Sequence, residues 1–315
     1  PSQSKLTKAL ARVTANRLES TLSRTPGASM ELSWFVSCRR FGSGSWLHAI
    51  PSVSCFQVES AVFRTMLCNR LLGPVPEART MVRCVCGHPV RSDLVTGIHY
   101  FGQCSLCSDL KWRHDQVAIV LRGLLAELKL DVEHGERAVW WSQAPELRPF
   151  DVLYRERAIG SIWKGLDVGI ADPTRTALLF SQTRQRWFRS GQAANWMAQQ
   201  KLTDYNGLLS RFGSPRVATS FSPFIIEASG GFGGRAKELF EHWCDLAGNI
   251  GVGANYRRDA EDVYDAALVD PDPAAIHEFT HSAMNFSSWW LQRLPFMAVK
   301  CIAKAVLGGI GRSAA

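Results

Sequence analysis

The order of apolar patterns between residues 113 and 247 limits the fold more than any other feature of this sequence. A helical stripe is followed by three runs typical of strands, then by a helical stretch, a fourth strand and a final helix. The helical patterns cover about Arg113–Leu130, 185–212 and about 234–247, and the strand runs are Val139–Trp141, Phe150–Tyr154, Ile162–Ala171 and Phe221–Ala228. This alternation predicts an α/β fold with a central sheet.

The sequence on either side divides into further segments. Residues 1–45 are basic and helical, and residues 46–83 form a helical scaffold with a helix that begins near Ser54 and stops at Gly73. Residues 84–112 form a cysteine-rich knuckle. Residues 248–315 are expected to form a linker and a C-terminal helical extension, after the α/β domain at 113–247.

Charge and hydropathy narrow the class of protein. Thirty-six Lys and Arg against 28 Asp and Glu give a net charge of +8, which favours contact with nucleic acid over contact with a membrane surface. Polar residues interrupt the most apolar stretch, Trp289–Ile310, so we expect an amphipathic helix packed on the body of a soluble protein. We expect a nuclear protein, or a mitochondrial one if the basic residues 1–29 follow a removed transit peptide.

Four of the nine cysteines crowd between Cys84 and Cys107, which is typical of a metal site in a reducing compartment. Structural zinc takes four Cys or His ligands in a tetrahedron. The predicted quartet is Cys84, Cys86, His99 and Cys104. Cys107 or His88 can replace one member of this quartet, and buried free cysteines are the alternative to any metal site.

Two aspartates point to a second, catalytic metal. Asp151 and Asp167 are separated by a hairpin-sized interval, so antiparallel pairing can bring their carboxylates together at one edge of the sheet. Two such carboxylates can hold Mg²⁺ against a scissile phosphate. Solvent-facing aspartates at strand ends are the alternative.

These motifs together resemble a known family. The Cys-x-Cys-Gly run with its later His and Cys, followed by Arg113-His114-Asp115, resembles the zinc knuckle and the Arg-His-Asn/Asp signature of restriction-enzyme-like endonucleases from non-LTR retrotransposons. Arg148–Asp151 and Gly165–Val168 resemble the blocks that carry the two catalytic aspartates of that family. The resemblance implies a restriction-endonuclease-like core, in the order helix, three strands, helix, strand, with PD-(D/E)xK chemistry.

The sequence departs from that pattern at the catalytic lysine. Gly169 stands two residues after Asp167, where a PD-(D/E)xK enzyme carries its lysine. Lys201, on the following helix, is the best candidate for a migrated lysine. Lys164 is a weaker candidate, because three positions along a strand reverse the face of the sheet.

Two basic segments with aromatic residues are candidates for contact with nucleic acid, because cations neutralise phosphates while aromatic rings stack on unpaired bases. The alternative is that the rings face the core and leave the arginines in water. The residues expected to bind are Arg113, His114, Arg184, Arg186 and Arg189.

The resulting hypothesis is a Mg²⁺-dependent endonuclease module that nicks DNA. The alternative is a catalytically inactive, domesticated descendant that serves as a structural or nucleic-acid-binding subunit of a larger assembly such as a ribonucleoprotein.

Overall fold

The central sheet has four strands and mixed direction. In the computed structural model, α4 (Leu110–Glu127) is followed by β1 (Asp131–His134), β2 (Val152–Arg155), β3 (Trp163–Ala171), α6 (Gln192–Phe212), β4 (Thr219–Glu227) and α7 (Gly234–Asn249). The strand order is β1-β2-β3-β4, with β1 to β3 antiparallel and β4 parallel to β3. The predicted α/β class is confirmed. The structure describes residues 3–49, 54–78, 83–87, 104, 109–134, 141–144, 146–157, 160–175, 192–215, 219–251 and 285–314.

The first strand lies earlier than the sequence predicts. The run at Val139–Trp141 is not β1: Val139 and Trp140 lie outside the described residues, and Trp141 is in no strand. Instead, the Trp141 indole is buried and donates a hydrogen bond to the Gly213 carbonyl at 2.9 Å. The chain leaves α4 through Lys129, which has a φ of 56°, and enters β1 at Asp131.

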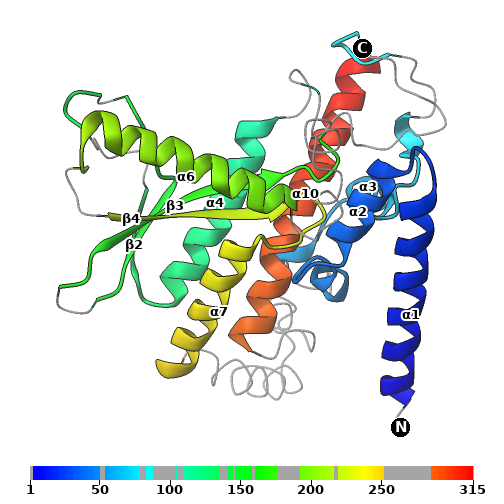
Figure 1. The fold of residues 1–315 in the computed structure, drawn as a ribbon, viewed down its shortest axis with the longest axis horizontal. Helices are drawn as coiled ribbons and strands as arrows, with labels where there is room; N and C mark the ends of the chain where they lie inside the picture. The colour runs from blue at the N-terminus through cyan, green and yellow to red at the C-terminus, as the bar shows by residue number, and fades with distance from the viewer. Residues whose placement is uncertain are drawn as a thin grey trace, which may run out of the picture.

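Helices cover both faces of the sheet (Figure 1). Val152, Leu166 and Phe224 pack with α4, α7 and α10 (Phe286–Ala314) in one buried cluster. On the opposite face, Leu153 and Ile225 contact the residues of α6. The sheet is therefore buried between two helical layers, and apolar burial on both faces is the main source of its stability.

An N-terminal segment packs beside this α/β body (Figure 1). It contains α1 (Gln3–Arg24), α2 (Ser29–Cys38) and α3 (Ser60–Leu71), with short 3-10 turns at Ser45–His48, Ser54–Phe56 and Pro76–Ala78. The helix expected to begin near Ser54 therefore begins at Ser60, and Ser54 belongs to the second of these turns.

Hydrogen bonds connect the end of α2 and the loop after it to the end of β4 and the turn after it. The Ser37 hydroxyl donates to the Glu227 carboxylate, and the Ser43 hydroxyl donates to the Ser229 carbonyl at 3.0 Å. The Phe232 amide donates to the Phe41 carbonyl at 3.0 Å. Glu227 is only 1% exposed, so the Ser37 hydroxyl and the Ala194 amide, which donates to the other carboxylate oxygen at 3.4 Å, satisfy a group that has almost no contact with water.

The C-terminal helix α10 is long and apolar enough to cross a membrane by length and composition, but 67% of its most apolar window is buried inside the protein. Its residues Trp290 and Leu294 belong to the main core, and the Trp290 indole donates to the Glu127 carboxylate at 3.0 Å. This helix is packed as core helices are.

Candidate metal centres

The register of β2 and β3 brings Asp151 and Asp167 together. Val152 pairs with Leu166, and the Asp151 amide donates to the Leu166 carbonyl at 2.8 Å, so Asp151 lies one position beyond the pair and opposite Asp167. Gly165 makes room for the side chain that precedes Asp151, because a β-carbon at Gly165 would lie 2.3 Å from the Phe150 ring. The Phe150 side chain is thus buried against β3.

Lys201 reaches the same place from α6. Its ammonium donates to an Asp167 carboxylate oxygen, and both side chains are less than one quarter exposed. A β-carbon on Gly169 would lie 3.3 Å from Lys201 Cε and 2.9 Å from the sulfur of Met197. The Lys201 side chain therefore lies over the strand position where the lysine of a PD-(D/E)xK motif would start.

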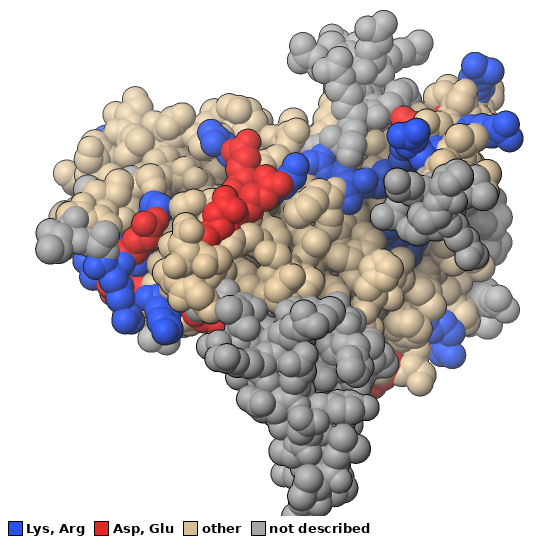
Figure 2. Space-filling model, turned by 90° about the horizontal axis from the view of Figure 1, so that it is seen from below, with Lys and Arg blue, Asp and Glu red and all other residues tan. Residues whose placement is uncertain are grey.

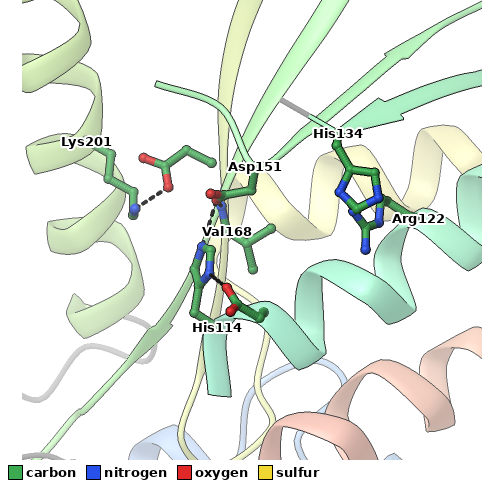
Figure 3. Close-up of polar contacts among 8 residues, drawn as sticks. His114, Arg122, His134, Asp151, Val168 and Lys201 are labelled. Carbon is green, nitrogen blue, oxygen red and sulfur yellow. Dashed lines mark hydrogen bonds and ion pairs between the residues drawn. The ribbon is translucent and has the colours of Figure 1, made fainter. Parts of the chain in front are cut away.

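His114, the fifth residue of α4, lies beside Asp151 (Figure 3) and within reach of Asp167. Its Nε2 lies 2.8 Å from Asp151 Oδ2, and its Nδ1 lies 3.0 Å from Asp115 Oδ1. The basic segment around His114 predicts a contact with nucleic acid, and nothing in the sequence indicates that this residue lies beside Asp151. No spacing signal relates the start of this helix to the end of a hairpin more than 30 residues away, so only the tertiary structure reveals the contact.

The charged groups of His114, Asp151, Asp167 and Lys201 lie close together, and this shifts the pKa of Asp167 and of His114. Burial raises the pKa of Asp167 to about 6; Lys201 opposes the rise and the neighbouring Asp151 adds to it. Burial would lower the pKa of His114, but hydrogen bonds and attraction from Asp151 and Asp115 outweigh it and raise the pKa to about 9. The Val168 amide also donates to Asp151 Oδ2 at 2.6 Å.

The donor set fits a divalent cation. One ligand atom each from His114, Asp151 and Asp167 lie within 4.8 Å of one another. Ligands on opposite sides of an ion such as Mg²⁺ are about 4 Å apart, twice a bond of 2.0–2.1 Å, so small side-chain movements would close such a site. We refer to these three residues as the His-Asp-Asp cluster.

A second group of potential ligands is made by cysteines. The sulfurs of Cys84, Cys86 and Cys104 lie within 4.8 Å of one another, with Cys84 and Cys104 buried and Cys86 exposed. The Cys84 and Cys104 sulfurs are 3.6 Å apart, close to the spacing of about 3.8 Å expected for two thiolates on tetrahedral zinc with bonds of 2.3 Å. This Cys triad can hold a metal such as zinc. His99, Cys107 and His88 lie outside the described residues.

The other candidate residues are placed differently. Arg113 is only 3% exposed; burial lowers the pKa of its guanidinium, and Asp172 is the charge that opposes this most. Lys164 bonds Glu156 at 2.7 Å and lines a different pocket, with Tyr154, between the sheet and α7. Arg184, Arg186 and Arg189 lie outside the described residues.

On the face drawn in Figure 2, the Lys and Arg side chains of the described residues do not form one continuous basic patch. Figure 2 shows an acidic streak across one side of the molecule, with Lys and Arg side chains in several separate places around it. The positive net charge therefore does not by itself mark a nucleic-acid interface on this face.

Comparison with protein-family models, with curated proteins and with solved structures found no match to this chain.

Proposed function

We propose that this chain is a metal-dependent DNA endonuclease module of the kind found in non-LTR retrotransposons. The observation that supports this most directly is that Asp151, just before β2, lies close to Asp167 of β3, and that Lys201 of α6 contacts Asp167. The order of one helix, three strands, one helix and a parallel fourth strand also supports a restriction-endonuclease-like core.

In this proposal, Asp151 and Asp167 hold a divalent cation such as Mg²⁺. When bound, the cation polarises the scissile phosphate and lowers the pKa of an attacking water. The Val168 amide holds Asp151 in position through its 2.6 Å hydrogen bond. Lys201 places its ammonium beside the phosphate. A preorganised cation there stabilises the negative charge that develops in the transition state.

The Cys triad has a structural role in this proposal. Cys84, Cys86 and Cys104 bind Zn²⁺ with His99 as the fourth ligand, and a site filled entirely by protein leaves no position for substrate. Such a site would hold the knuckle together ahead of α4, which carries His114. The arginines outside the described residues, together with other surface cations, would bind the phosphate backbone.

The test is a nicking assay on supercoiled and linear duplex DNA with Mg²⁺ or Mn²⁺. Asp151→Asn should abolish cleavage and leave DNA binding intact, because the carboxylate serves the metal and not the DNA. Asp204→Asn, an exposed aspartate on α6, is the matched control and should cleave normally. If the wild-type protein cuts no duplex, bubble or flap substrate, the inactive nucleic-acid-binding subunit replaces the enzyme.

A further inference from the structure

The His-Asp-Asp cluster contains a nitrogen donor that two-carboxylate chemistry does not require. The His114 ring enters from α4, while the carboxylates come from the hairpin of β2 and β3 (Figure 3). Its Nε2 faces Asp151 Oδ2 at 2.8 Å, so the ring nitrogen points toward the carboxylates and not into solvent. Only 26% of the His114 side chain is exposed.

The other ring nitrogen has a partner of its own. Nδ1 lies 3.0 Å from Asp115 Oδ1, next to it in the sequence. Histidines that ligate metals usually donate one N–H to a carboxylate in this way, which fixes the ring and leaves the opposite nitrogen for the metal. Asp115 would therefore orient His114 with Nε2 toward the position between Asp151 and Asp167.

We infer that His114 is a third ligand of the same metal, and that its imidazole makes the site selective for Mn²⁺ over Mg²⁺. This inference rests on the metal site of the proposed function and names the cation class that the site takes. Mg²⁺ prefers oxygen donors and keeps much of its water, whereas imidazole binds transition metals well. One nitrogen donor beside two carboxylates therefore favours Mn²⁺ over Mg²⁺.

The competing explanation is that His114 only positions Asp151 through their ion pair. The two explanations differ in what happens when the ring is removed. A positioning role predicts that the affinities for Mn²⁺ and Mg²⁺ change together, since both ions need Asp151. A ligand role predicts a loss confined mainly to Mn²⁺.

The experiment is calorimetric titration of the full chain with MnCl₂ and, separately, MgCl₂. Wild-type protein should bind Mn²⁺ the more tightly of the two. His114→Ala should weaken Mn²⁺ binding by about 10–100-fold, a loss typical of damage to a ligand set, and change Mg²⁺ binding far less. His48→Ala, at an exposed histidine outside the cluster, should change neither affinity.

Two further measurements keep the inference testable if His114→Ala fails to fold. Pulsed electron paramagnetic resonance of Mn²⁺ bound to wild-type protein should detect coupling to an imidazole nitrogen. Asp115→Asn retains the ring and should weaken Mn²⁺ binding more than Mg²⁺ binding, because it loosens the orientation of the ligand.

Parallel changes for both ions, or Mn²⁺ bound without nitrogen coupling, would overturn the inference and leave the endonuclease proposal intact. Mn²⁺ binding that depends on His114 in a protein that cuts no DNA would overturn the endonuclease proposal alone. If neither ion binds wild-type protein, both ideas fail.

Discussion

Lys201 contacts Asp167 from a different element than the one that carries Asp167, crossing from α6 to β3 above Gly169. Because Gly169 has no side chain, the long side chain of Lys201 has room to pass over it to Asp167. An ammonium reaches the carboxylate although the strand itself carries no lysine at that position.

Lys201→Ala should lower the rate of DNA cleavage by a factor on the order of 10²–10³, the loss typical when one preorganised transition-state donor is removed. Single-turnover kinetics at saturating metal would measure it. The control is Lys164→Ala, because Lys164 bonds Glu156 away from the His-Asp-Asp cluster. An equal loss in both variants would mean that neither lysine acts at the reacting phosphate.

Gly169→Ala should displace Lys201 while the protein stays folded. The new methyl group would meet three side chains, at 2.9 Å from Ile225 Cδ1 and Met197 Sδ and at 3.3 Å from Lys201 Cε. Overpacking of this kind costs about 1–3 kcal/mol, and the shifted ammonium should slow cleavage. Gly207 is an exposed residue of α6 where an added β-carbon would meet no atom within 4 Å. Gly207→Ala should therefore leave the cleavage rate unchanged. Urea unfolding and cleavage kinetics would measure both effects.

Asp167→Asn should stabilise the metal-free protein at neutral pH. The folded-state pKa of about 6 lies above the ordinary aspartate pKa of 3.8, so the folded protein binds more protons and stability falls as the pH rises through this window. A neutral amide avoids that loss. We expect a gain on the order of 1–3 kcal/mol at pH 7.5, from about 1.4 kcal/mol per pKa unit, and a much smaller gain at pH 4.

Urea titrations at the two pH values, in the presence of a chelator, would measure this difference. Asp204→Asn is the matched control, because the Asp204 carboxylate is exposed on α6, the helix that carries Lys201. A gain that is the same at pH 4 and pH 7.5 would show that the ionised carboxylate is not the source of the instability.

Cys84→Ser should remove bound zinc and lower the melting temperature, because ligation of a structural metal contributes folding free energy. Elemental analysis of wild-type protein prepared without chelator should give about one equivalent of zinc. Cys244→Ser, on α7 and outside the Cys triad, should keep its metal. Zinc-free wild-type protein would show that the Cys triad holds no structural zinc.

The sequence predicted the parts of the fold that periodicity controls. The helix before the sheet appears where a 3.6-residue apolar repeat runs along the sequence, and β2, β3 and β4 appear where short apolar runs occur, since both faces of these strands are largely buried. The meeting of Asp151 with Asp167 also followed from the sequence, because antiparallel pairing fixes which residues lie opposite each other.

What periodicity could not provide was the packing between elements. The aromatic run before β2 predicts a strand, but the Trp141 ring packs in a hydrophobic cluster against α6. His114 was assigned to nucleic acid because it lies in a basic segment, and its neighbour Asp151 is brought to it only by the way α4 crosses the sheet. The approach of two elements at an angle leaves no repeat in either sequence.

The bond from Ser37 to Glu227 bears on how the protein can be dissected. A fragment that begins at residue 113 would carry a buried carboxylate without its hydroxyl partner and a Phe232 amide without the Phe41 carbonyl. A synthetic peptide spanning residues 29–43 would restore both partners. The α/β body should therefore behave as a receptor for its own upstream segment, and complementation in trans becomes a practical way to assemble it from two pieces.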